Sequence, residues 1–297
     1  MSQFFSDTPA GLMDELERQF LDADLFYGHG TDNARDEAAY LVLGALQLPF
    51  DADEDVLNQS LTDEQCERVR NLAAERIQTR WPVAYLINQA WFCGLPFYVD
   101  ERVLIPRSPI AELIEERFIP WADEEKVTRI MDIGTGSGCI AVACALAFPG
   151  ARVDAVDVSE EALAVAKINI EQHAVGDSVR VVQSDIFENL PDELYDLIVA
   201  NPPYVDFGEM QDLPEEYRHE PGEVALAAGS DGLDIVRRIL AGARQHLNPG
   251  GILIVEVGNS RQALEHAFPD MPFTWLEFER GGQGVFLLSA EQLDPVH

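Results

Sequence analysis

The feature that most constrains the fold is an alternation of short apolar runs, turns and helical segments from residue 127 onward. Strands are expected at 128–133, 152–156, 179–182, 195–200 and 252–257, followed by a terminal pair at 274–279 and 284–288. Helices are expected between them at 139–148, 159–173, 233–246 and 260–268. Strands that alternate with helices favour a mainly parallel sheet covered on both faces. The sequence therefore predicts an α/β fold here.

The N-terminal part of the chain has a different pattern. Apolar residues recur at helical spacing in 12–26 and 33–48, and a third helix is expected from Thr62 to about Arg80. Thr62 opens a capping-box pattern, which marks a helix start. These helices predict a small domain over 1–88, which serves either to grip a partner or only as a packing appendage.

A β-hairpin linker is expected over 89–107, because residues 89–105 alternate around two turns. The next helix is expected at 110–118, with Ser108 as its N-cap and Pro109 in its first turn. Residues 108–297 then form the main domain, and the long acidic loop 206–230 is expected to be a lid or a binding element.

A candidate acceptor site is the sequence Asn201-Pro202-Pro203-Tyr204, which follows the apolar run 197–200. Open α/β sheets bind ligands at the carboxyl ends of their strands. Asn201 offers a side-chain carbonyl, and two consecutive prolines leave backbone carbonyls without neighbouring N–H donors. Tyr204 adds a flat aromatic face. The motif suits a planar –NH2 group, although the same residues also occur in plain turns.

A glycine-rich loop at 132–138 joins the first strand of the main domain to its first helix. Glycines there permit a tight turn and a close approach of the backbone to a ligand. Their Gly-x-Gly-x-Gly spacing differs from the dinucleotide fingerprint. Asp132, which precedes the glycines, suits a cofactor with a cationic amino-acid group better than a cofactor with a pyrophosphate. We expect this wall of a cofactor site to comprise Asp132, Gly134, Thr135, Gly136 and Gly138.

Two more acids follow the next two strands. Asp157 is placed to accept both hydroxyls of a ribose, although it also lies just before the predicted helix cap Ser159. Asp185 could accept from an adenine amino group while Ile186 packs on the ring. Together with Asp132, these acids predict S-adenosylmethionine as cofactor and S-adenosylhomocysteine as product, in preference to a nicotinamide cofactor.

The chain is strongly acidic, with 20 Lys and Arg against 53 Asp and Glu and a formal net charge of -33. Binding to a nucleic-acid backbone depends on cationic side chains that release counterions, so no stable nucleic-acid binding is expected. The charge favours a basic protein partner through electrostatic steering. Acidity alone also fits a role in solubility or a salty habitat.

The N-terminus, the hydropathy and the cysteines argue against a secreted, membrane-spanning or metal-binding protein. Residues 1–11 lack a signal-peptide pattern, and no apolar run approaches the roughly 20 residues of a membrane span, so a cytoplasmic protein is expected. The four cysteines show neither C-x-x-C pairing nor metal-ligand spacing with histidine, so we expect free thiols and no metal.

A sulfonium cofactor beside an –NH2 pocket implies methyl transfer to a planar nitrogen. If Asn201 Oδ1 and the Pro202 carbonyl accept the two hydrogens of an amide, the nitrogen is oriented toward the methyl group. Fixed dipoles then stabilise the positive charge that develops on the nitrogen. Asn201 to Tyr204 are therefore the candidate catalytic residues, and no base is required.

These motifs resemble, over essentially the whole chain, the protein N(5)-glutamine methyltransferase family of class I, S-adenosylmethionine-dependent enzymes. The resemblance implies a Rossmann-like class I domain with a mostly parallel seven-stranded sheet and an antiparallel terminal strand. It implies that 1–88 bind the protein substrate and that 132–138, Asp157 and Asp185 bind the cofactor. Asn201 is expected to contact both cofactor and substrate.

Two branches of this family differ after the hairpin. The release-factor branch typically reads Pro-Arg-Pro followed by acidic and Thr residues, whereas this chain reads Pro106-Arg107-Ser108-Pro109-Ile110. Residues 214–221 also resemble the branch that methylates a glutamine of the large-subunit ribosomal protein L-three. Arg107 at the active-site mouth and Glu220 at the pocket wall are expected to bind substrate with Asn201, Pro202 and Tyr204, although an ion pair is the simpler role for Arg107.

Two other functional classes stay open. An adenine-N(6) methyltransferase of nucleic acid also accepts a planar –NH2 group, but it must extrude a base and hold phosphates, for which this chain offers few clustered cations. A binding module that retains the cofactor fold without catalysis is the other alternative.

Overall fold

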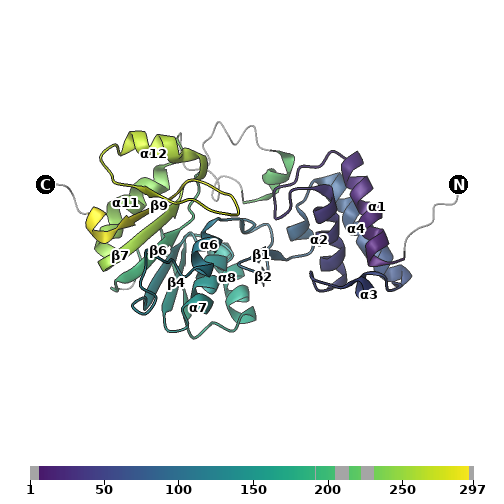
Figure 1. Ribbon diagram of the computed structural model, residues 1–297, viewed down its shortest axis with the longest axis horizontal. Helices are drawn as coiled ribbons and strands as arrows, with labels where there is room; N and C mark the ends of the chain where they lie inside the picture. Colours follow the sequence, from purple (N-terminus) through teal and green to yellow (C-terminus); the bar gives the residue numbers. More distant parts are fainter. Residues whose placement is uncertain (1–6, 191, 205–213, 222–230, 294–297) are drawn as a thin grey trace. The chain divides into compact units, whose positions relative to one another are not determined.

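The structure is a computed structural model, and it describes residues 7–190, 192–204, 214–221 and 231–293 (Figure 1). The chain divides into two compact units. The helical unit comprises the residues up to Ala90 together with Pro214–His219, and the sheet unit comprises the remainder. The helical unit thus extends two residues beyond the predicted boundary at 88. It also includes a segment that the sequence assigns to the main domain.

The helical unit contains the three predicted helices, α1 (Pro9–Asp22), α2 (Ala34–Leu46) and α4 (Asp63–Thr79). The capping box is confirmed, since Gln65 N donates to Thr62 Oγ1 at 3.3 Å and Thr62 N donates to Gln65 Oε1 at 3.0 Å. Two four-residue helices, α3 (Glu54–Leu57) and α5 (Val83–Leu86), were not predicted, because they are too short to show a helical period. The fully buried apolar side chains include Leu12, Leu16, Phe20, Leu41 and Val69.

A buried ionic cluster fixes residues 214–219 within the helical unit. Arg76 is 1% exposed, and its Nε donates to Glu37 Oε1 at 2.9 Å while its Nη1 donates to Glu216 Oε1 at 3.4 Å. Glu216 Oε1 also accepts from Phe26 N at 3.0 Å. The Tyr217 ring lies 4.4 Å from the His29 ring, centroid to centroid. These contacts span up to 190 positions in the chain, so they make the segment an integral part of the unit.

Glu216→Gln is expected to destabilise the helical unit by about 1–3 kcal/mol. Glutamine keeps one acceptor oxygen for Phe26 N, but it removes a negative charge from the buried guanidinium of Arg76. The measurement is the urea midpoint followed by far-UV circular dichroism, with exposed Glu215→Gln as the control. Equal midpoints in the two variants would show that the buried pair adds nothing to stability.

The predicted hairpin is present in a shorter form, with β1 (Ala90–Phe92) paired to β2 (Leu95–Phe97). The helix predicted at 110–118 begins at Ile110 as expected, but its N-cap is not Ser108 and it ends earlier than predicted. Helix α6 (Ile110–Glu115) has Pro109 as N-cap, and it ends early because Arg117 and Phe118 adopt positive φ angles of 52° and 57°. Ser108 Oγ still accepts from Ile110 N at 3.2 Å.

The sheet unit is built on a seven-stranded sheet of order β5-β4-β3-β6-β7-β9-β8. The pairs among β3 to β7 are parallel, and β9 pairs antiparallel with both β7 and β8, so the predicted α/β fold with a mostly parallel sheet and an antiparallel terminal strand is confirmed. The predicted strand 274–279 is shortened to two residues. The strands are β3 (Arg129–Ile133), β4 (Arg152–Asp157), β5 (Val179–Gln183), β6 (Tyr195–Ala200), β7 (Leu247–Glu256), β8 (Thr274–Trp275) and β9 (Val285–Ser289).

Helices cover both faces of this sheet (Figure 1). Helices α6, α7 (Cys139–Ala147) and α8 (Glu160–Gln172) contribute to one apolar core with Ile130 of β3. Helices α11 (Asp234–His246) and α12 (Arg261–Ala267) contribute to the other core with Met131 of β3. Successive strand residues therefore enter opposite cores, as the pleat of a strand requires. The predicted cap of α8 is confirmed, because Ser159 Oγ accepts from Ala162 N at 3.2 Å.

The strand order reverses at β3, whose neighbours are β4 on one side and β6 on the other. Parallel pairing places Ile133 beside Val156 of β4 and beside Ala200 of β6. Such a switch point leaves a crevice at the carboxyl ends of the strands. The glycine loop, Asp157 and Asn201 each follow or end one of these strands, so the fold gathers them at one edge.

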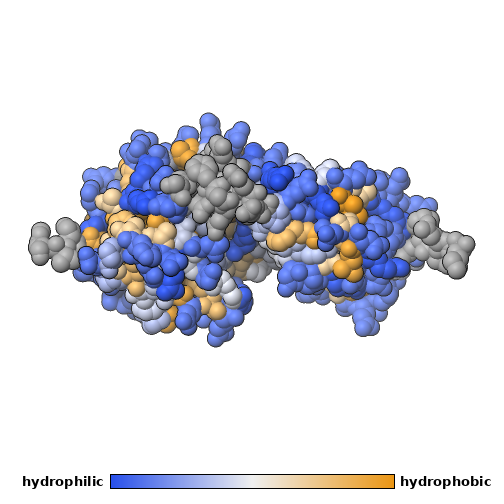
Figure 2. All heavy atoms as spheres, turned by 90° about the horizontal axis from the view of Figure 1, so that it is seen from above, coloured by the Kyte–Doolittle hydropathy of each residue, from blue (hydrophilic) through white to orange (hydrophobic). Residues whose placement is uncertain are grey.

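The surface in the view of Figure 2 is mostly hydrophilic on each unit, with hydrophobic residues in separate small patches. The most exposed large apolar side chain in the described ranges is Leu21, at 62%. Among the described residues, no helix has both the length and the apolar character that a bilayer crossing requires. A predominantly polar exterior agrees with the net charge of -33.

Candidate functional site

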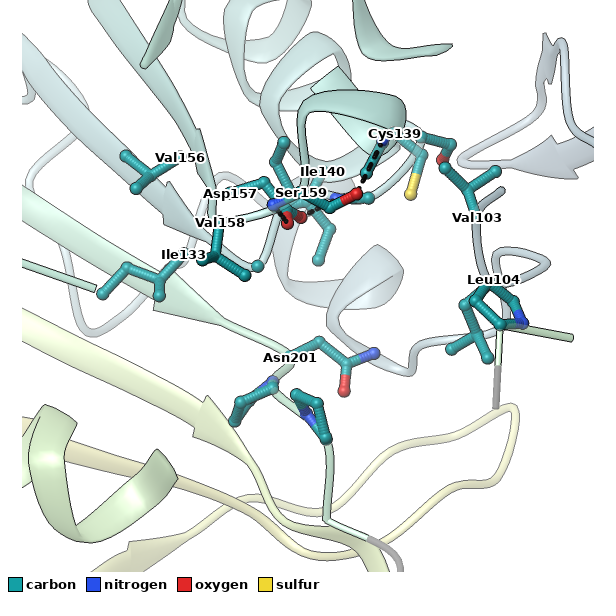
Figure 3. Close-up of a pocket in the computed structure, with 18 of the residues that line it drawn as sticks. Val103, Leu104, Ile133, Cys139, Ile140, Val156, Asp157, Val158, Ser159 and Asn201 are labelled. Atoms are coloured by element: carbon teal, nitrogen blue, oxygen red, sulfur yellow. Dashed lines mark hydrogen bonds between the residues drawn. The ribbon is translucent and has the colours of Figure 1, made fainter. Parts of the chain in front are cut away.

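A cavity of about 720 Å³ lies in the sheet unit at the carboxyl edge of β3, β4 and β6 (Figure 3). Its lining comes from five segments and from Pro221 and Ile235. The volume is that of a small-molecule site. The segments lie within 101–108, 133–140, 156–162, 184–186 and 201–203.

The glycine loop forms one wall of the cavity. Gly134, Gly136 and Gly138 have φ angles of 72°, 53° and 79°, which L side chains rarely adopt. Gly134, Thr135 and Gly136 line the cavity as predicted. Gly138 does not, because it faces α8, where a Cβ would lie 3.1 Å from Ala166 Cβ. Its glycine is therefore needed for close packing of the loop on the helix.

Asp132 lies behind this loop and not on the cavity surface. Its side chain is fully buried, and Oδ2 accepts from Thr135 Oγ1 at 2.5 Å and from Ala141 N at 3.2 Å. Oδ1 has no hydrogen-bond partner among the residues that the structure describes. Burial raises the pKa of this carboxyl to about 7, although both hydrogen bonds favour the ionised form. Asp132 thus braces the loop and retains one free acceptor.

Asp157 lines the cavity at the end of β4. Its Oδ2 accepts from Gly136 N and its Oδ1 from Ser159 N, both at 2.9 Å. Burial raises the pKa of Asp157, while these backbone donors oppose the shift. Each carboxylate oxygen keeps a second lone pair. The side chain is therefore held rigidly while it still has two acceptor positions for a ligand.

Asp185 and Ile186 line a third part of the cavity. Ile186 has a φ of 55°, an outlier for a β-branched residue, and such strain is concentrated at functional sites. Asp185 Oδ2 lies 2.8 Å from Arg238 Nη2 on α11. Arg238 is not among the predicted site residues, because no motif surrounds it.

The acceptor motif supplies the wall next to the glycine loop. Asn201, Pro202 and Pro203 line the cavity, and a Cβ on Gly134 would lie 3.7 Å from the Asn201 carbonyl oxygen. Figure 3 shows the Asn201 side chain pointing into the cavity. Within the described part of the chain its amide makes no hydrogen bond. The group is thus available to a ligand.

The other predicted substrate-contacting residues are arranged differently. Arg107 lines the cavity and also forms the ion pair considered for it, with Nη1 2.5 Å from Glu220 Oε1 and Nη2 2.7 Å from Glu220 Oε2. Glu220 is 2% exposed and does not line the cavity, although Pro221 does. Tyr204 does not line it either, because its hydroxyl donates to Glu256 Oε1 at 3.0 Å.

Residues 101–106 form a further wall of the cavity that was not predicted. Val103 and Leu104 of this wall are visible in Figure 3. The segment was assigned to the hairpin linker, and the strand pattern there concealed its role. Within the described ranges, no group of three or more His, Cys, Asp or Glu residues is arranged so that it could hold a metal ion.

Comparisons with known proteins show which proteins this chain is similar to. Residues 117–215 match the family described as Methyltransferase small domain. The chain is 50% identical over 276 residues to the ribosomal protein uL3 glutamine methyltransferase of Neisseria meningitidis serogroup A, which covers 93% of this chain and 90% of that protein. It is 46% identical over 271 residues to the protein of the same name from Francisella tularensis subsp. tularensis. That alignment covers 91% of this chain and 86% of the other protein.

A solved structure shows the same fold. The hMettl16 catalytic domain, crystallised in complex with MAT2A 3'UTR hairpin 6, superposes with a TM-score of 0.51 and 21% sequence identity. The superposition covers 77% of this chain and 81% of that chain. At this level of identity the likeness concerns the fold alone.

Proposed function

We propose, since this chain belongs to the ribosomal protein uL3 glutamine methyltransferase family, that it methylates the side-chain amide nitrogen of a glutamine in ribosomal protein uL3. The methyl donor is S-adenosylmethionine. The observation that carries the proposal is that Asn201 and the Asp157 carboxylate line the same cavity. A side chain that can accept hydrogen bonds from an amide and a carboxylate suited to a ribose therefore line the same cavity.

The residues of the cavity fit this cofactor. Asp157 presents two rigid acceptors suited to ribose hydroxyls, and the buried Asp132 retains an unpaired oxygen near the glycine loop. Asp185 and Ile186 are placed for the adenine, with Asp185 already oriented by Arg238. When bound, the cofactor supplies an electrophilic methyl group on a sulfonium sulfur.

The acceptor motif orients the substrate amide. Asn201 Oδ1 and the Pro202 carbonyl accept its two hydrogens, which directs the nitrogen lone pair toward the methyl carbon. The bound cofactor would supply the methyl group, the substrate nitrogen would accept it, and one amide proton would then leave to water. The two carbonyl dipoles stabilise the positive charge on nitrogen before that proton departs.

The charge of the protein supports a basic substrate. Residues 1–90 contain 17 Asp and Glu against six Arg and no Lys, so the helical unit is acidic as a whole. Such a surface steers basic proteins and disfavours a phosphate backbone. We assign the binding of the ribosomal protein to this unit, and we place the reaction in the cytoplasm.

The test is incubation of the protein with methyl-labelled S-adenosylmethionine and purified uL3 that lacks the modification. Release factors and DNA serve as competing substrates. Label on a glutamine amide of uL3 is expected. Label in a release factor would assign the chain to the sister activity, and label only in DNA would overturn the assignment of the acceptor pocket.

Asp157→Asn is expected to weaken S-adenosylhomocysteine binding about tenfold or more, because one of its two carboxylate acceptors becomes a donor. Isothermal titration measures the dissociation constant, with exposed Asp177→Asn as the matched control. The wild type is expected not to bind NAD. Unchanged affinity in Asp157→Asn would contradict the ribose assignment.

A further inference from the structure

A buried carboxylate joins the acceptor motif to a second cavity segment. Glu256 ends β7 and is 5% exposed. Its Oε1 accepts from the Tyr204 hydroxyl at 3.0 Å, and its Oε2 accepts from Ser108 Oγ at 2.5 Å. Tyr204 ends the acceptor motif, and Ser108 lines the cavity next to Arg107. One carboxylate therefore holds two segments that lie about 100 positions apart in the chain.

Tyr204 is also held at its backbone and along its ring. Ser260 Oγ donates to the Tyr204 carbonyl at 2.9 Å. A Cβ on Gly258 would lie 2.5 Å from Tyr204 Cε2, and a Cβ on Gly232 would lie 2.3 Å from the Tyr204 carbonyl oxygen. Only glycine leaves room for the tyrosine at both positions, so its location is closely defined.

A tyrosine fixed in this way restricts the residues before it. Strand β6 anchors the motif at Ala200, and Tyr204 anchors it at the other end. Pro202 and Pro203 lie between these anchors, and a proline ring locks φ near −65°. Few backbone torsions are then left free. The directions of the Asn201 side chain and the Pro202 carbonyl thus depend on where Tyr204 is held.

We propose that Glu256 is a positioning residue for the acceptor motif, and that it acts through its hydrogen bond to the Tyr204 hydroxyl. The inference rests on the proposed function, because the motif is taken to hold the substrate amide. A carboxylate suits the task, since it offers an acceptor oxygen to each of the two hydroxyl donors. Glutamine has the same size but only one acceptor oxygen, so it can satisfy only one of them in the same way.

Two single variants and one matched control test this role. Glu256→Gln and Tyr204→Phe are each expected to lower kcat for amide methylation roughly 10- to 100-fold, because small misplacements of orienting groups have effects of this size. KM for the protein substrate and S-adenosylhomocysteine affinity are expected to stay within about twofold. Tyr195→Phe is the control, since Tyr195 begins β6, the strand that leads into the motif, and its hydroxyl donates to buried Asp154 of β4 at 2.7 Å, away from the cavity. It is expected to keep wild-type kcat.

The double variant separates positioning from independent effects. If Glu256 acts through Tyr204, Glu256→Gln combined with Tyr204→Phe lowers kcat no further than the more damaging single change. Additive losses would overturn the inference, as would a kcat in Glu256→Gln equal to that of Tyr195→Phe.

Hydrogen exchange of the unliganded protein supplies a readout that does not depend on the reaction. Faster amide exchange is expected in peptides covering 197–204 in Glu256→Gln and in Tyr204→Phe, but not in Tyr195→Phe. Equal exchange in all three variants would overturn the inference. If the wild type labels no uL3, the proposed function fails, and the exchange experiment still decides whether Glu256 positions the motif.

Discussion

Asn201→Ala is expected to lower kcat for glutamine methylation by about 100- to 1,000-fold, the size of effect seen when one preorganised polar group is removed from a reacting centre. The side chain points into the cavity and makes no hydrogen bond within the described residues, so its removal leaves no protein donor or acceptor unsatisfied. Affinity for S-adenosylhomocysteine is expected to change little. Single-turnover transfer of labelled methyl groups to uL3 measures the loss.

Two further substitutions define what Asn201 contributes. Asn201→Asp keeps an acceptor oxygen at the same position, so it is expected to retain more activity than the alanine variant. Asn248→Ala is the matched control, because Asn248 donates to Asp196 at 2.7 Å at the far end of the sheet and does not line the cavity. A turnover in Asn201→Ala equal to that in Asn248→Ala would refute an acceptor role.

The parts of this site that could be predicted are those encoded locally. The glycine loop and Asn201 each follow an apolar run, and the carboxyl ends of neighbouring parallel strands meet at one edge. Asp157 belongs to the same group, since it ends the next strand. For these residues, the position in the sequence directly after a strand is enough to place them at the carboxyl edge of the sheet.

The parts that could not be predicted depend on contacts between distant segments. Glu256 stands at a strand end without a recognisable motif, and its partner Ser108 was assigned only to a helix cap. Residues 214–219 belong to the helical unit because Glu216 pairs with Arg76, which lies 140 positions away. Residues 206–213 and 222–230, most of the predicted 206–230 loop, lie outside the described residues.

The stability of the unliganded protein is expected to depend on pH through Asp132. Burial raises the pKa of the Asp132 carboxyl from 3.8 to about 7 in the folded protein. Between these values the unfolded chain loses the proton while the folded protein keeps it, so stability is greatest below the lower value and falls as pH rises toward 7. From pH 5 to pH 7 the loss is about 2 kcal/mol, which is less than the full slope of about 1.4 kcal/mol for each pH unit because the folded carboxyl is already half ionised at its own pKa. Above about pH 8 this contribution is constant.

Asp132→Asn isolates this contribution, because asparagine does not titrate. The free energy of unfolding of the variant minus that of the wild type is expected to rise by about 2 kcal/mol between pH 5 and pH 7 and to level off by about pH 8. Urea unfolding of the unliganded proteins at closely spaced pH values gives the difference, in which the titration of groups distant from Asp132 cancels.

Thr135→Val tests whether the pKa of Asp132 changes in the expected direction. The Thr135 hydroxyl donates to Asp132 Oδ2 and favours the ionised carboxylate, so its removal raises the pKa of Asp132 further. The decline in stability should then continue to a higher pH in the valine variant than in the wild type, which levels off at about pH 8. Parallel curves for the wild type and Asp132→Asn between pH 5 and pH 8 would mean that the carboxyl titrates normally. In that case Asp132 would brace the glycine loop as a carboxylate at every pH at which the enzyme works.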